Sequence, residues 1–181
     1  MFISLIKKRR SIRKFLKRPV ENEKIDLLIE AALRPPSSMG RMPWEFIVVK
    51  DQGLLEKLSR SKNRGSAFIM NAPLAIVVCA DPEKSDVWIE DTSIASTYIF
   101  LAAESLGLGG CWIQIRKRSH NEEITSQVYI SDLLDIDNNL EVLSIIALGY
   151  PDEELPPHEK DTLKYDRIHL DMYGNLYENK S

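Results

Sequence analysis

The sequence contains little cysteine, and its two cysteines predict neither a metal centre nor a disulfide framework. Cys79 and Cys111 are far apart in the chain, and each lies inside an apolar run. Neither belongs to a CxxC pair or has a histidine or second cysteine at the spacing of zinc ligands. We therefore expect two buried free thiols in a reducing compartment, and no bound metal.

Long apolar runs and a secretory leader are also missing. The longest apolar region, from Ile94 to Leu108, contains Thr97 and Glu104, and it falls short of the ~18 residues expected of a membrane span. The first residues place a short apolar part before a basic part, the reverse of a secretory signal. The 181 residues show no repeat and no linker. These features predict one cytoplasmic domain, residues 1–181, without a membrane partner.

The signatures of several enzyme classes do not occur. The chain has no P-loop, no GxGxxG after an expected strand, no GxSxG and no histidine pair at helical spacing. None of its three histidines has a nucleophile or carboxylate at motif spacing, so we expect no histidine general base. The glycine-rich stretch 107–110 has two interpretations: the end of a helix followed by a turn, or a close approach of the backbone to a flat ligand.

A basic segment near the N-terminus stands out in a chain whose net charge is -3. Residues 7–18 contain eight Lys or Arg residues and no acid, so these charges repel one another unless a ligand or solvent compensates them. In extended backbone, Arg9, Ser11 and Arg13 would share one side. Two guanidinium groups beside a hydroxyl are good phosphate donors. On charge alone, a solvated basic turn is the better explanation of the segment.

Nucleic-acid binding is a poor explanation of the basic segment. The segment is short, the whole chain is acidic, and no nucleic-acid-binding motif accompanies it. The long helix expected at residues 87–106 is apolar where a nucleic-acid reader would be basic. We expect no nucleic-acid partner.

Hydrophobic periodicity predicts an α+β fold in which helices cover a sheet. Helices are expected at residues 4–9, at 22–33 with Asn22 as N-cap, after the N-cap Asp51, at 87–106, and at 119–129 behind a capping box of Ser119 and Glu122. Strands are expected at residues 46–49, 74–80, 111–115 and 143–149. Because the helix at 87–106 is apolar on most sides, we favour packing against a second copy of the chain over a purely internal core.

Several segments, taken in order, resemble the FMN-dependent nitroreductase family. They are Arg9–Phe15, Pro35–Val49, Asn71–Pro73, Leu106–Trp112 and Ala147–Pro151. The resemblance implies an α+β nitroreductase-like fold with a central mixed, mainly antiparallel sheet flanked by helices. It also implies a homodimer with intertwined termini that holds one FMN at each interface.

The resemblance assigns FMN contacts to several parts of the chain. The family positions for the phosphate and ribityl chain are occupied here by Arg9, Ser11 and Arg13, with Arg10 adjacent. The loop expected to reach the flavin ring from the other subunit contains Pro36, Ser37 and Ser38. The strand expected beside the ring, where a peptide N–H meets flavin N5, contains Trp112, Ile113 and Gln114.

Other family positions match less well. A carboxamide contact to the ring edge is missing because Gly40 and Met42 occupy its places, and Arg41 is the candidate replacement. Approximate equivalents of an Asn and a Lys near the ring are Asn63 and Arg64. Candidates for a late basic residue that returns to the phosphate are His158 and Lys160.

The function that the resemblance implies is an NAD(P)H-dependent FMN oxidoreductase. In a ping-pong cycle, NADH or NADPH would give hydride to flavin N5 and leave, and a nitroaromatic, quinone or related electrophile would then take the electrons. No catalytic side chain is expected, because the cofactor carries out the difficult chemistry. An FMN-binding or storage protein, a flavin reductase, and a specialised dehydrogenase or dehalogenase of the same superfamily are the alternatives.

Overall fold

A four-stranded antiparallel sheet forms the centre of the protein in the computed structural model, which describes residues 2–177. The strands lie in the order β1-β2-β4-β3. Their bounds are Trp44–Val49 for β1, Leu74–Ala80 for β2, Gly109–Gln114 for β3 and Glu141–Gly149 for β4. All four expected strands are therefore confirmed, with ends shifted by a few residues. Met1 and residues 178–181, which belong to the range predicted as one domain, lie outside the described residues.

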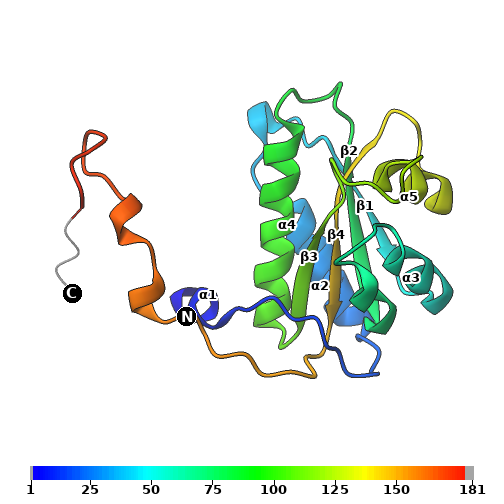
Figure 1. Cartoon of the computed structure of the whole chain (residues 1–181), viewed down its shortest axis with the longest axis horizontal. Helices are drawn as coiled ribbons and strands as arrows, with labels where there is room; N and C mark the ends of the chain where they lie inside the picture. Colours follow the sequence, from blue (N-terminus) through cyan, green and yellow to red (C-terminus); the bar gives the residue numbers. More distant parts are fainter. Residues whose placement is uncertain (1, 178–181) are drawn as a thin grey trace.

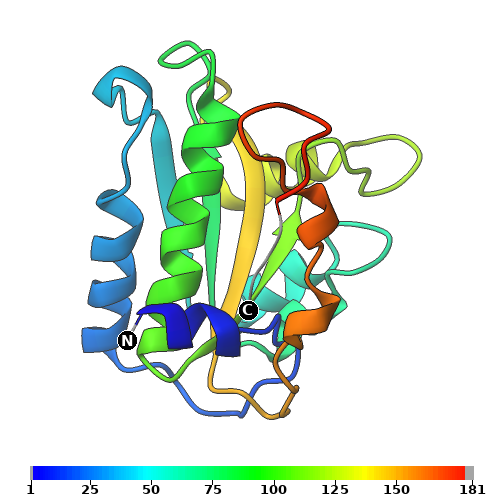
Figure 2. The ribbon, with the colours of Figure 1, turned by 90° about the vertical axis from the view of Figure 1, so that its left-hand side faces the viewer.

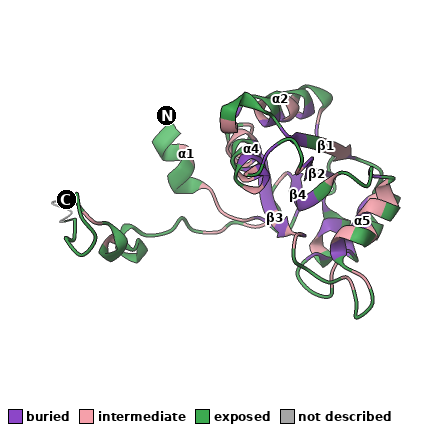
Figure 3. Cartoon of the chain, turned by 90° about the horizontal axis from the view of Figure 1, so that it is seen from above, coloured by how far each residue is buried: buried purple, intermediate pink, exposed green. Residues whose placement is uncertain are grey.

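Helices cover both faces of the sheet. Their bounds are Phe2–Lys8 for α1, Asn22–Leu33 for α2, Gln52–Ser59 for α3, Trp88–Ser105 for α4 and Ser126–Leu134 for α5, with short 3-10 turns η1 to η4 at Ser38–Gly40, Ala67–Asn71, Lys160–Thr162 and Tyr165–Arg167. Helices α2 and α4 lie on one face, and α3 and α5 on the other (Figures 1 and 3). This arrangement confirms the predicted α+β fold.

The two central strands divide their side chains between two apolar layers. In β2, Ile76 and Val78 pack with the helices α2 and α4, whereas Ala75 and Val77 pack with α3 and α5, as the alternation of a strand requires. Every residue of β2 is buried. Cys79 is a buried free thiol, as predicted, and burial raises its pKa to about 12.

The predicted N-cap of α2 is wrong, and that of α3 is confirmed. Asn22 is the first helical residue and Glu21 holds the N-cap position, while the Asn22 side chain accepts a hydrogen bond from Lys50 Nζ at 2.8 Å. Asp51 does cap α3, because its Oδ1 accepts from the backbone N–H of Leu54 at 2.8 Å. The sequence allows a side-chain cap at both Asn22 and Asp51. The Asn22 side chain binds Lys50, which is distant in sequence, and does not cap its helix.

The helix predicted at residues 119–129 is also wrong at its start. Thr125 is the N-cap of α5, and its Oγ1 accepts from the backbone N–H of Val128 at 3.2 Å. Upstream, Asn121 Oδ1 accepts from two backbone N–H groups of its own loop. This turn takes the place of the capping box, so the loop continues for several residues before the helix begins.

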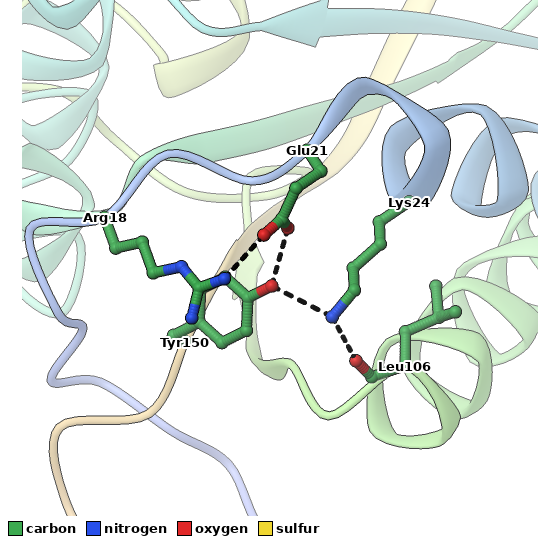
Figure 4. A network of polar contacts seen from close by, with 5 residues as sticks. All are labelled: Arg18, Glu21, Lys24, Leu106 and Tyr150. Carbon is green, nitrogen blue, oxygen red and sulfur yellow. Dashed lines mark hydrogen bonds and ion pairs between the residues drawn. The ribbon is translucent and has the colours of Figure 1, made fainter.

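A polar network ties the N-terminal segment to the sheet and to the end of α4 (Figure 4). The Glu21 carboxylate accepts from Arg18 Nη2 and from the Tyr150 hydroxyl, each at 2.6 Å. Lys24 Nζ donates to the Tyr150 hydroxyl at 2.9 Å and to the Leu106 carbonyl at 2.7 Å. The Tyr150 hydrogen bond is the main cause that lowers the pKa of Glu21 to about 2. The network thus links three segments that are far apart in sequence: residues 18–24, the end of α4 at Leu106, and Tyr150 after β4.

The replacement Tyr150→Phe should reduce stability in a pH-dependent way. Glu21 has a pKa of about 2 when folded and 4.5 ordinarily, so its contribution is fully present above pH 4.5 and is lost as the pH falls from 4.5 through about 2. Without the hydroxyl, we expect Tm to fall by about 2–4 °C at neutral pH, and the loss of Tm towards low pH to become shallower. Thermal unfolding between pH 2 and 7 measures both effects.

Tyr129→Phe is the matched control for this change. Its hydroxyl donates to the Lys57 carbonyl at 3.0 Å, and this hydrogen bond involves no carboxylate. It should therefore change Tm by a similar amount at every pH. If Tm of Tyr150→Phe changed with pH in parallel with Tm of the parent, the Tyr150 hydrogen bond would not be the main cause of the low pKa of Glu21.

The two ends of the chain leave the body of the protein beside β3 (Figures 1 and 2). Helix α1 has no buried residue, so its apolar side chains do not join the core of the described chain. Residues 152–177, here called the C-terminal arm, extend past α1. The arm exposes several large apolar side chains: Leu163, Ile168, Leu170, Met172, Tyr173 and Leu176. Beyond its first residues, the arm runs away from the body of its own chain (Figure 1).

Among residues 2–177, no helix is both long and apolar enough to cross a membrane.

Candidate functional site

The basic segment lies along one edge of β3. Ser11 forms a parallel bridge with Gly110, and the Ile12 N–H donates to the Gly110 carbonyl at 3.0 Å. The other side of β3 pairs with β4. Because backbone groups alternate in direction along a strand, those of Gly110, Trp112 and Gln114 all point away from β4. We call this outward side of β3, formed by these three residues, the β3 edge.

A glycine makes the contact between the basic segment and β3 possible. A Cβ atom on Gly109 would lie 2.6 Å from Cγ1 of Ile12, which is too close for any side chain. Gly107 has φ +74° and follows the end of α4, as expected of a helix C-cap. The helix-end interpretation of the glycine stretch is therefore confirmed at Gly107, and the close approach at Gly109 is to Ile12 of the basic segment. An approach of this backbone to a flat ligand stays a prediction.

Lys62 occupies the other end of the β3 edge. Its Nζ donates to the Gln114 carbonyl at 3.3 Å, so the backbone of Trp112 lies between Lys62 and the basic segment. The sequence pointed to Asn63 and Arg64 in this loop, and both are exposed. Lys62 was missed because the loop has no periodicity, and charge alone did not distinguish Lys62 from Arg64.

Three cations from separate segments follow the same strand. Burial lowers the pKa of Lys62, and the charge of Arg118 lowers it further. Burial raises the pKa of Cys111, while the charges of Arg13 and Lys62 oppose that rise. Arg13 follows the Ser11–Gly110 bridge, Lys62 is held at Gln114, and Arg118 lies in the turn just after β3; we call these three residues the cation row. A planar anion lying on the β3 edge would meet positive charge along its length.

The start of the C-terminal arm organises the basic segment. Glu153 Oε1 accepts from the backbone N–H groups of Arg13 at 2.6 Å and Lys14 at 3.1 Å, and these contacts lower the pKa of Glu153. Arg10 donates to the Pro156 carbonyl, so its guanidinium is engaged with the arm. Ile12 is buried and Arg13 is exposed, as expected where neighbouring side chains of an extended segment point to opposite sides.

The side chains of β3 divide as a strand predicts. Ile113 is buried in the layer of α3 and α5. Trp112 points to the other face and packs with Trp88, and its Nε1 donates to Gln114 Oε1 at 2.9 Å. Of these predicted ring neighbours, the backbone groups of Trp112 and Gln114 lie on the β3 edge, whereas the side chain of Ile113 belongs to the core.

The loop with Pro36, Ser37, Ser38 and Arg41 lies at the opposite end of α4 from the basic segment. The Ser38 N–H donates to Asp91 Oδ1 at 2.8 Å, and Arg41 pairs with Asp86 at 3.3 Å. At the other end of the helix, Lys8 lies 4.0 Å from Glu104. Asp91 and Glu104 are more than three helical turns apart, about 20 Å along the axis. One chain therefore does not bring this loop to the basic segment.

His158 and Lys160 lie on the C-terminal arm, and Lys160 begins η3. The arm runs away from the body (Figure 1), so the described chain does not bring these two residues to its own β3 edge.

The expectation of no bound metal concerns a possible cluster of ligating side chains. Within residues 2–177, no group of three or more His, Cys, Asp or Glu side chains is arranged to hold a metal ion.

The fold and the site define an α+β protein that has an open strand edge flanked by cations. A sequence model of the nitroreductase family matches residues 6–64 and 54–150. The chain belongs to the nitroreductase family, as the sequence resemblance indicated.

Solved and curated relatives are consistent with this membership. The structure of an FMN-dependent nitroreductase from Clostridium difficile is 48% identical with a TM-score of 0.93, and the match covers 94% of this chain and 99% of that one. The NADPH-flavin oxidoreductase of Vibrio harveyi is 28% identical over 97% of this chain and 74% of its own length. The FMN reductase (NAD(P)H) of Bacillus subtilis is 27% identical over 91% of this chain and 76% of its own length.

Proposed function

We propose that this chain is an FMN-dependent oxidoreductase that uses NAD(P)H to reduce nitroaromatics, quinones or related electrophiles. The observation that carries the proposal is the β3 edge, where the backbone of Trp112 lies between the basic segment and Lys62. Family membership supports it. When bound, FMN accepts hydride from NADH or NADPH and delivers the electrons to the acceptor.

The basic segment fits the phosphate end of FMN. Arg9 and Arg13 offer planar forks of N–H donors and Ser11 a short hydroxyl donor. The Ser11–Gly110 bridge fixes this segment at the start of β3. From there the β3 edge runs toward Lys62, so the flavin ring would lie beside Trp112, whose outward N–H is placed to meet a ring nitrogen.

Lys62 fits the ring end of the site. It is only part-buried, it is held by the Gln114 carbonyl, and its positive charge can stabilise negative charge that develops on a reduced ring. Lys62 thus takes the role that the sequence gave to Asn63 or Arg64. The protein's contribution is position and charge, and no side chain needs to act as a general acid or base.

The site would be completed by a second copy of the chain. The loop with Pro36, Ser37 and Ser38 is about 20 Å along α4 from the basic segment, so its contact with the same FMN requires a partner. Helix α1 and the C-terminal arm leave apolar side chains exposed on the β3 side of the body. A homodimer with intertwined termini would bury these side chains, and it would let Arg41 reach the mouth of the partner's site.

Purified protein saturated with FMN tests the proposal. We expect a yellow dimer by light scattering, with one FMN per chain, that oxidises NADH or NADPH in the presence of a nitroaromatic, a quinone or free flavin. Initial rates should give parallel double-reciprocal lines, as a ping-pong cycle requires. Colourless protein after addition of FMN would refute every flavin assignment. Yellow protein inactive with every acceptor would instead identify a flavin-binding or storage protein.

A further inference from the structure

A turn directly after β3 carries three consecutive cations, Arg116, Lys117 and Arg118. The turn is rigid, because the Arg118 N–H donates to the Ile115 carbonyl at 2.9 Å and the Arg116 N–H to the Leu143 carbonyl at 3.1 Å. Lys117 has φ +57°, a left-handed conformation that side-chain-bearing residues adopt rarely. The backbone that carries the three cations is therefore held at the end of the strand.

These cations lack carboxylate partners. Among the ion pairs formed within residues 2–177, none involves a residue of the 116–118 turn. Arg116 lies over the Trp88 ring at 5.8 Å, and Arg118 donates to the Lys117 carbonyl. Asp132 and Glu141 line the same cavity as the turn, but they do not pair with it. The turn thus keeps a local excess of positive charge.

A cavity of about 710 Å³ opens beside the turn, a size typical of sites for small molecules. The turn also adjoins the proposed active site, because it begins two residues after Gln114, whose carbonyl accepts the hydrogen bond from Lys62. From Gly110 to Ile115 the strand rises about 17 Å. A ligand whose phosphate lies on the basic segment would therefore have its far end close to this turn.

We infer that the 116–118 turn binds the phosphate groups of the reductant, and that the enzyme consequently prefers NADPH to NADH. The inference rests on the proposed function, since it concerns the nucleotide that exchanges electrons at the β3 edge. NADPH differs from NADH by a 2′-phosphate, which carries up to two more negative charges. Lys117 and Arg118 can bind that group with charge-assisted hydrogen bonds. The basic segment is already assigned to the phosphate of FMN, which leaves the turn for a second phosphate ligand.

The ratio of kcat/KM for NADPH to that for NADH, measured on FMN-loaded protein, tests the inference. We expect the parent to favour NADPH by at least tenfold, and Lys117→Gln/Arg118→Gln to lower that ratio by at least tenfold. The effect should appear in KM more than in kcat. Lys50→Gln/Lys84→Gln removes the same charge far from the site and should leave the ratio unchanged.

A binding measurement gives an independent result. Adenosine 2′,5′-bisphosphate should bind the FMN-loaded parent in calorimetry and lose most of its affinity in the double variant. The charge-retaining variant Lys117→Arg/Arg118→Lys should keep both binding and preference, which separates loss of charge from damage to the turn. Equal kcat/KM values for the two nucleotides in the parent, or an unchanged ratio in Lys117→Gln/Arg118→Gln, would overturn the inference. Failure to bind FMN would instead overturn the proposed function.

Discussion

Replacing both Arg9 and Arg13 with alanine is expected to weaken FMN binding by at least about a hundredfold. Each guanidinium can form charge-assisted hydrogen bonds to the phosphate worth about 1.5–3 kcal/mol. The loss of binding free energy in the double variant should be close to the sum of the losses in the two single variants if the two side chains contact different phosphate oxygens. Titration of FMN with the FMN-free protein, monitored by the quenching of FMN fluorescence, measures the change in affinity.

Lys14→Ala/Lys17→Ala is the matched control, because it removes two positive charges from the same segment. The contact of Lys14 with Glu153 uses its backbone N–H, so it survives the substitution. This pair should weaken FMN binding by less than about tenfold, as expected of exposed charges that act only at long range. Equal losses in both double variants would mean that the segment attracts FMN by net charge and has no phosphate clamp.

Gly109→Ala is expected to lower FMN affinity without removing any charged group. The new Cβ would lie 2.6 Å from Ile12 Cγ1 and 2.8 Å from Ile12 Cβ, so the basic segment must move away from β3. Overpacking of this kind costs about 1–3 kcal/mol, and displacement of the Arg9 and Arg13 side chains should weaken FMN binding further. Thermal unfolding and the same fluorescence titration measure the two effects separately.

The double variant Gly109→Ala/Ile12→Ala shows whether the clash is the cause. It removes the Cγ1 and Cγ2 atoms of Ile12, which are two of the three atoms closest to the new methyl group. Part of the lost FMN affinity should return, even though Ile12→Ala alone removes buried apolar surface. Gly109→Ala protein that binds FMN as tightly as the parent would show that the approach of the basic segment to β3 does not position the clamp.

The sheet and most helices could be predicted because their signals are local and strong. The β-branched run of β2 is apolar on both faces, which fits only a central strand. Asp51 is followed closely by the leucines of α3, and its cap formed as predicted. The two errors at helix starts have a different origin. Asn22 and Ser119 each satisfy a capping pattern, but Lys50 engages the Asn22 side chain, and a turn around Asn121 displaces the start of α5.

The candidate site could be predicted only in part, because it depends on contacts across the chain. The sequence placed Ser11 and Trp112 in one site, and the bridge between Ser11 and Gly110 brings their segments together. Lys62 could not be predicted as a site residue, because its position depends on how the loop after α3 folds back on β3. The direction of the C-terminal arm was also beyond prediction: Leu155 packs against the core, but the large apolar side chains from Leu163 to Leu176 are exposed.

The relative affinities of FMN and riboflavin test the central claim most directly. Riboflavin has the same ring and ribityl chain but no phosphate, so it cannot use a clamp formed by Arg9, Ser11 and Arg13. The parent protein should bind FMN at least about a hundredfold more tightly than riboflavin, and Arg9→Ala/Arg13→Ala should bind the two ligands almost equally. Equal affinities for FMN and riboflavin in the parent would contradict the assignment of the basic segment to the FMN phosphate.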